Sequence, residues 1–143
     1  MRFLALAACV MVAACGGGQG DLVGNWECKY SANGMSFESD STYLSNGRTS
    51  GNFVMSGSDS GNQLEMSGTY TGTWDLEGDQ LTETAERMTI VTFSVNGRVV
   101  NDPALISRFE QSMVGQSDVA EIKALTSDTF VTSSSEGTTT CSR

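Results

Sequence analysis

Three carboxylates, Asp75, Glu77 and Asp79, surround a Glu-Gly-Asp turn and are a candidate for calcium binding or acid–base chemistry. Their order does not match the calcium loop D-x-[DN]-x-[DN]-G-x₅-E, which favours a solvated turn. The sequence has no histidine, the usual general base and the commonest metal ligand near neutral pH. It also has no G-x-S-x-G elbow and no phosphate-binding loop. We therefore expect that the protein is not an enzyme and that it has no metal site and no cofactor.

The amino-terminal residues indicate a cellular address. Arg2 is followed by an uncharged apolar run over residues 3–14, which is too short to span a bilayer and suits the core of a signal peptide. The run ends in Val-Ala-Ala-Cys at Cys15 and resembles the lipobox of bacterial lipoproteins. The resemblance implies cleavage before Cys15 and acylation, for example by palmitate, of the new terminal residue. A second match at Cys9 leaves an apolar core of only about six residues, so we expect the anchor at Cys15.

Three segments follow from this assignment: a lipoprotein signal peptide at 1–14, a lipidated cysteine with a glycine-rich tether at 15–21, and one folded domain at 22–143. In lipoproteins, a residue other than aspartate after the cysteine is associated with the outer membrane, and here it is Gly16. We expect a protein of the bacterial envelope that is anchored in the outer membrane and faces the periplasm. An ordinary secretory signal with an incidental cysteine is the alternative.

Two cysteines remain, Cys28 and Cys141, and in an oxidising compartment such thiols normally pair. No C-x-x-C spacing or neighbouring base supports a redox role, so a structural disulfide is expected. Cys28 lies in the first strand-like segment and Cys141 in the last. A disulfide requires the two backbones to be close, and an antiparallel sheet whose first and last strands are neighbours is a barrel.

The pattern of the chain is that of an all-β protein. Residues 64–76 alternate between apolar and polar side chains, with Gly68 and Gly72 on the apolar side as expected bending points. Asn-Gly pairs predict hairpin turns, residues 56–62 predict a longer polar loop, and alternation slips near Arg87, which indicates a bulge. Strands are predicted around Phe53 and at 22–30, 35–45, 64–77, 80–95, 98–100, 119–125, 129–134 and 138–143.

One helix interrupts the strands. Asp102 is placed as its N-cap, Pro103 at its first position and Gly115 at its end, and apolar residues recur between them at helical spacing. The predicted fold is therefore an antiparallel up-and-down β-barrel of about eight strands with one short helix.

Two G-x-W elements, Gly24-Asn25-Trp26 and Gly72-Thr73-Trp74, resemble the signature of lipocalins and lipocalin-like barrels. The resemblance implies a barrel with a tryptophan packed across one end and a small apolar ligand inside. In the best-known lipocalins the helix follows all eight strands, whereas here it precedes the last three. The ligand-binding residues that we expect are Trp26, Tyr43, Tyr70 and Trp74, chosen from seven inward aromatic residues that also include Phe53, Phe93 and Phe130. The alternative is that these side chains simply fill the barrel.

Charge bears on the choice of partner. The chain has 8 basic and 17 acidic residues, and without Arg2 the net charge is 7 minus 17, or -10. Such a chain is unsuited to nucleic acid. We therefore expect membrane contact through Cys15 and either a small apolar ligand or a basic protein as partner. A protein-binding module similar to lysozyme inhibitors and a structural envelope lipoprotein without a ligand stay open as alternatives.

Overall fold

The computed structural model describes residues 18–143, so the predicted signal peptide and the predicted anchor Cys15 lie outside the described residues. The helices are α1 (Gln19–Leu22) and α2 (Pro103–Met113). The strands are β1 (Gly24–Ala32), β2 (Met35–Tyr43), β3 (Arg48–Asp59), β4 (Asn62–Glu77), β5 (Gln80–Val95), β6 (Arg98–Val99), β7 (Ser117–Leu125), β8 (Thr129–Ser133) and β9 (Thr138–Ser142).

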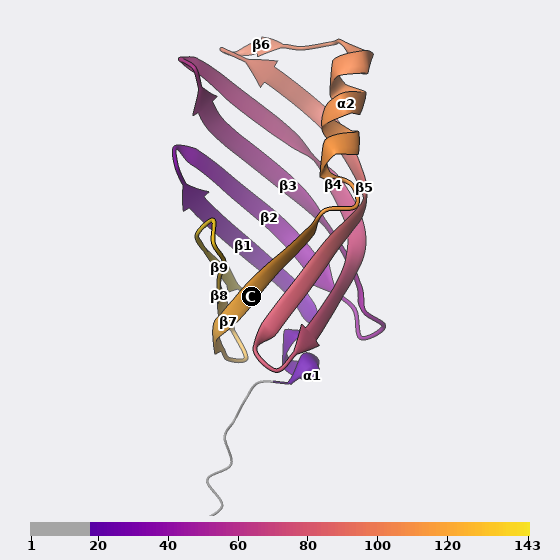
Figure 1. The fold of residues 1–143 in the computed structure, drawn as a ribbon, viewed down its shortest axis with the longest axis vertical. Coiled ribbons are helices and arrows are strands. Elements are labelled where there is room, and N and C mark those ends of the chain that lie inside the picture. Colours follow the sequence, from indigo (N-terminus) through magenta and orange to yellow (C-terminus); the bar gives the residue numbers. More distant parts are fainter. Residues whose placement is uncertain (1–17) are drawn as a thin grey trace, which may run out of the picture.

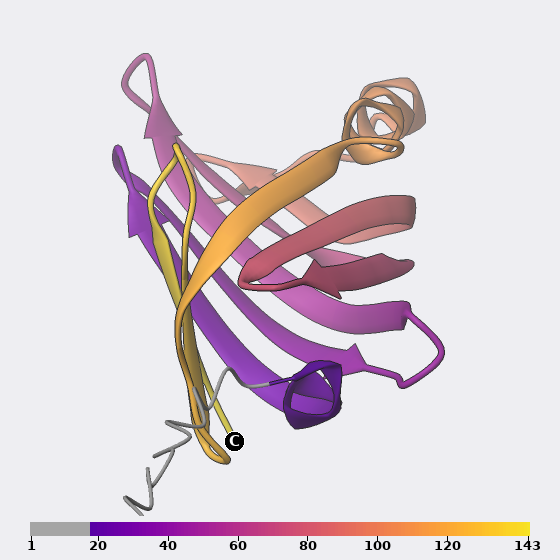
Figure 2. The ribbon, with the colours of Figure 1, turned by 60° about the horizontal axis from the view of Figure 1, so that its bottom comes forward.

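The strands form a closed antiparallel barrel (Figure 1). Eight strands follow one another around the ring in the order β1-β2-β3-β4-β5-β7-β8-β9, and β9 pairs with β1 to close it. The short β6 pairs with β5. Figures 1 and 2 show α1 at one end of the barrel and α2 at the other. The predicted fold class, an up-and-down barrel of about eight strands with a short helix, is confirmed.

The predicted disulfide is present and joins the two ends of the sheet. Cys28 and Cys141 are cross-strand partners in β1 and β9, with Cα atoms 4.0 Å apart. Both side chains are buried. The bond therefore lies inside the barrel, at the seam where the first strand meets the last.

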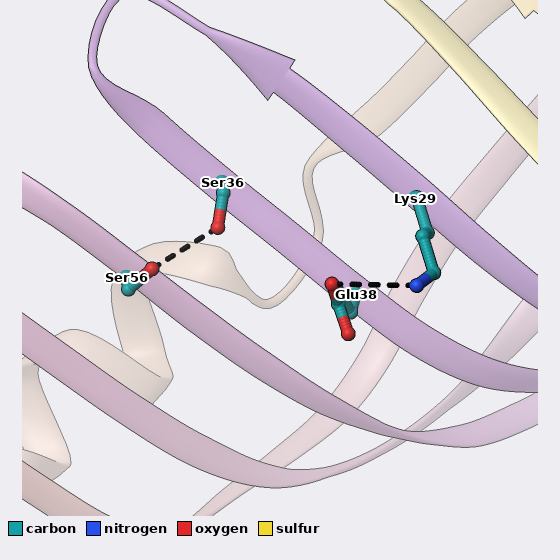
Figure 3. A network of polar contacts seen from close by, with 4 residues as sticks. All are labelled: Lys29, Ser36, Glu38 and Ser56. Atoms are coloured by element: carbon teal, nitrogen blue, oxygen red, sulfur yellow. Dashed lines mark hydrogen bonds and ion pairs between the residues drawn. The ribbon is translucent and has the colours of Figure 1, made fainter.

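The predicted polar loop at residues 56–62 is wrong. β3 continues to Asp59 and β4 begins at Asn62, with Ser60 and Gly61 between them at φ 50° and 83°. Two consecutive positive φ values make a type I′ turn, whose twist suits a two-residue hairpin. Ser56, one of the polar residues that suggest a loop, faces outward and contacts Ser36 of β2 at 3.0 Å (Figure 3). Figure 3 also shows the ion pair between Lys29 and Glu38 on the outer face, at 3.6 Å. Both side chains are exposed, so the pair adds little stability.

The long hairpin β4–β5 bends where the sequence predicts it. Pairing shifts between Ser67 and Gly68 and again between Thr71 and Gly72, so that Val91 and Glu86 of β5 have no partner. A Cβ atom on Gly68 or Gly72 would collide with a backbone carbonyl oxygen of β5. The bending points are confirmed, and the predicted bulge near Arg87 falls at the preceding residue.

Helix α2 begins and ends as predicted. The side chain of Asp102 accepts hydrogen bonds from the N–H groups of Ala104 and Leu105 at 3.0 and 3.2 Å. β7 pairs with only the first residues of β5, and α2 lies along the part of β5 beyond them (Figure 1). There Glu110 accepts a hydrogen bond from the Ile90 N–H at 2.8 Å. The helix thus packs along a strand edge that β7 leaves uncovered and satisfies one of its backbone donors.

Two apolar clusters fill the barrel at different heights. The α1-end cluster consists of the buried residues Leu22, Trp26, Cys28, Tyr43, Trp74, Leu76, Leu81, Phe130 and Cys141 with three partly buried neighbours. The α2-end cluster has four buried residues, Phe53, Met66, Ile90 and Phe93, and eleven that are only partly buried: Phe37, Met55, Leu64, Tyr70, Met88, Val95, Val100, Leu105, Ile106, Phe109 and Met113. One end of the barrel is therefore much better covered than the other.

Candidate ligand site in the barrel interior

The α1 end of the barrel is capped. α1 occupies the end of the predicted tether, and its last residue, Leu22, is fully buried. The Leu22 carbonyl accepts a hydrogen bond from Trp26 Nε1 at 2.8 Å. The Arg143 guanidinium lies 4.0 Å from the Trp26 ring and donates to the carbonyls of Asp21 and Val23 at 3.0 and 2.9 Å. These contacts hold both ends of the described chain across the base of the barrel.

Aromatic rings fill the space above this cap. Phe130 meets the edge of Trp26 with ring centres 4.8 Å apart, and Tyr43 meets Trp74 at 5.6 Å. Trp74 Nε1 donates to the Leu44 carbonyl at 3.0 Å. The structure therefore brings together three of the four predicted ligand residues, Trp26, Tyr43 and Trp74, in close packing within the α1-end cluster.

The α2 end is apolar but only partly covered. Phe37 stacks on Phe53 at 5.9 Å, and Phe109 of α2 meets Phe93 at 5.3 Å. Four α2 residues contact this cluster and are partly buried, but no residue of the helix is fully buried. The inner faces of β2 to β5 thus present an apolar surface that remains partly accessible. Tyr70, the fourth predicted ligand residue, belongs to this cluster.

A belt of hydroxyl groups separates the two clusters. Ser41 contacts the Tyr70 hydroxyl at 2.6 Å and Ser39 at 3.0 Å. Thr49, on the neighbouring strand β3, is only 4% exposed, and its Oγ1 makes no hydrogen bond of good geometry, although it lies close enough to the Tyr70 hydroxyl to lower the pKa of Tyr70. Burial raises the pKa of Tyr70, and the Ser41 hydrogen bond opposes that shift. The belt is therefore a set of neighbouring hydroxyl groups around Tyr70.

Glu83 places a carboxylate beside this belt. The Tyr43 hydroxyl donates to Glu83 Oε1 at 2.8 Å. Burial raises the pKa of the Glu83 carboxyl, the hydrogen bond from Tyr43 lowers it, and nearby Asp118, its cross-strand partner on β7, raises it further. Burial and the Glu83 charge raise the pKa of Tyr43 in turn. As a residue, Glu83 is half-buried.

The outer face of the barrel also carries a groove of about 680 Å³. It crosses β1 to β4, and its lining includes the polar residues Asn25, Glu27, Asp40 and Asn52 together with Trp26, Ser41 and Tyr70. The groove therefore reaches residues of the belt from the outer side of the sheet, whereas the partly buried apolar residues gather at the α2 end of the interior. We therefore place the candidate ligand site on the inner face, at the α2 end.

Sequence reasoning did not single out Glu83, Thr49 or Ser39. Alternation along residues 81–85 does place Glu83 on the inward side with Leu81, and that signal was available. Its pairing with Tyr43 depends on strands that are far apart in sequence, so it required the fold. Within residues 18–143, we find no group of three or more side chains suited to holding a metal ion. No helix of that same part is long and apolar enough to cross a membrane.

Comparisons with known proteins find similarity to a solved structure at low sequence identity. No protein-family model matches the chain, and no curated protein matches it. Among solved structures, the chain is similar to a lipocalin-like protein from Bacteroides uniformis, with a TM-score of 0.40 and 15% identity over 87% of this chain and 99% of that one. The strand order described above is the up-and-down arrangement predicted from the sequence.

Proposed function

We propose that the protein is a lipid-anchored barrel of the bacterial envelope that binds a small apolar molecule at the α2 end of its interior. The observation that carries this proposal is the contrast between the two clusters. Nine residues of the α1-end cluster are buried with three partly buried neighbours, whereas the α2-end cluster has four buried and eleven partly buried. Apolar surface left accessible inside a barrel is a binding surface, because covering it is favourable.

The amino-terminal segment supports the anchor. Under this proposal Cys15 carries the lipid, and α1, which begins four residues later, lies at the capped end of the barrel. Labelling with radioactive palmitate in a bacterial host is expected to mark the wild-type chain and the Cys9→Ser variant but not the Cys15→Ser variant. Cys15→Ser is also expected to leave the outer-membrane fraction. Label that follows Cys9, or no label at all, would overturn the anchor.

Binding is tested with the unlipidated mature chain, residues 15–143 with Cys15→Ser. The fluorescent apolar probe 1-N-phenylnaphthylamine is expected to bind saturably at one site. Met55, on the inner face, and Val54, 57% exposed on the outer face, are adjacent in β3 and offer matched variants. Met55→Glu is expected to weaken binding at least about tenfold, because 1.4 kcal/mol is a factor of ten and a charge in an apolar contact costs more.

The control variant, Val54→Glu, adds the same charge to the outer face and is expected to bind the probe as the wild type does. Circular dichroism and thermal unfolding of both variants establish that they are folded. Absence of saturable binding by the wild type would refute ligand binding and favour a structural envelope protein. Equal loss in the two variants would show that the probe does not occupy the inner face.

A further inference from the structure

We propose that the polar end of the ligand is a protonated amine, so that the barrel takes a cationic amphiphile such as a long-chain alkylamine. The inference rests on the proposed function and specifies the class of ligand for that site. The ammonium group lies at the belt between the clusters, beside Glu83, and the hydrocarbon chain lies on the α2-end cluster.

The belt and the apolar surface are contiguous. Tyr70 is a member of both, because its ring packs in the α2-end cluster and its hydroxyl contacts Ser41. Ser39 is the cross-strand partner of Phe53, one of the four buried residues of that cluster. A molecule with a polar end on the belt therefore has its chain directed along Phe53 towards α2.

Charge decides the kind of polar end. The titratable groups that face Glu83 are Tyr43 from β2, Tyr70 from β4 and Asp118 from β7, and none of them is basic. The basic side chains of the described residues lie elsewhere. Three pair with exposed glutamates, Arg143 caps the α1 end, and the remaining arginines are exposed. A fatty-acid carboxylate would thus meet a carboxylate without a counter-charge, whereas an ammonium would supply one.

Hydrogen bonding points to the same class of ligand. An ammonium offers three donors and no acceptor. Among the described residues, Tyr43 is the hydrogen-bond donor to Glu83, through one carboxylate oxygen, which leaves the other oxygen as an acceptor. Thr49, in register with Tyr43 on the neighbouring strand, places its Oγ1 near the Tyr70 hydroxyl. The belt therefore offers a carboxyl oxygen as an acceptor with no donor from the described residues, the complement of an alkylammonium head.

The test compares three ligands with the same twelve-carbon chain: dodecylamine, dodecanol and dodecanoate, each below its micellar concentration. Displacement of 1-N-phenylnaphthylamine from the unlipidated mature chain at pH 7 gives the three affinities. Dodecylamine is expected to bind at least about tenfold more tightly than dodecanoate, with dodecanol between them. Glu83→Gln is expected to bring the amine to the level of the alcohol and to leave the alcohol unchanged.

Glu65→Gln is the matched control, because Glu65 lies exposed on the outer face of β4 and its replacement removes the same charge. It is expected to leave the preference for the amine intact. A loss equal to that of Glu83→Gln would show that overall negative charge attracts the amine, and would overturn the inference. Equal affinity of the protein for dodecanoate and dodecylamine would also overturn the inference, although the proposed function would stand. Failure of all three ligands to displace the probe would refute the proposed function itself.

Discussion

Removal of the disulfide is expected to have a large effect on stability, and its size follows from the fold. Cys28 and Cys141 are 113 residues apart in sequence. For a closed loop of that length the chain-entropy relation gives about 4.8 kcal/mol at 25 °C, an upper value because denatured chains retain structure. We expect Cys28→Ala/Cys141→Ala to lower the free energy of unfolding by about 2–4.8 kcal/mol. In a chain of this size, such a loss removes a large share of the total.

The assay is urea unfolding of the unlipidated mature chain, followed by tryptophan fluorescence, in three samples: oxidised wild type, wild type reduced with a phosphine, and the double alanine variant. The reduced wild type keeps both buried sulfurs and so isolates the cross-link from their packing. The midpoint is expected to fall by on the order of 1–3 M urea. A loss below about 1 kcal/mol in both the reduced and the double-variant samples would refute the argument that closure of the β1–β9 seam depends on the bond.

Three further outcomes are expected. Burial raises the pKa of Glu83 in the folded state above its value in the unfolded state. The free energy of unfolding should therefore fall as the pH rises from the unfolded-state pKa to the folded-state pKa, by up to about 1.36 kcal/mol per unit of difference between the two. Glu83→Gln should abolish that fall in urea titrations at successive pH values, and a fall of equal size in the variant would contradict the assignment. Gly68→Ala should cost about 1–3 kcal/mol because its Cβ meets a β5 carbonyl, whereas Gly20→Ala, with open space, should cost under about 0.5. Asp102→Ala should cost about 1 kcal/mol and speed hydrogen exchange in α2, and unchanged exchange would contradict its role as N-cap.

Much of the fold follows from local signals. Alternation over residues 64–76, the Asn-Gly turns and the Asp-Pro start of α2 each depend on neighbours in sequence, and all are present in the structure. The cysteine argument added the one long-range constraint that closes the sheet. The Ser60–Gly61 turn was missed because polar residues on the outer face of a strand have the composition of a loop. Short helix α1 was missed because its glycine-rich surroundings predict a flexible segment.

The candidate site was less accessible to sequence reasoning. Alternation tells which face of a strand a residue occupies but not its height along the barrel axis. Trp26, Tyr43 and Trp74 therefore looked equivalent to Tyr70, although the first three are packed at the capped end and Tyr70 lies with the accessible cluster. Height depends on the register of all eight strands and on the bulges in β5, which are set by tertiary packing.

The central claim, that an apolar ligand binds at the α2 end of the interior, is tested most directly by NMR of the methionine methyl groups. Met55, Met66, Met88 and Met113 all belong to the α2-end cluster. Their signals in a methyl-labelled sample are expected to shift on addition of 1-N-phenylnaphthylamine, while the indole N–H signals of the two tryptophans in the capped end stay in place. Methyl signals that do not move at saturating probe, or indole signals that move instead, would contradict the account.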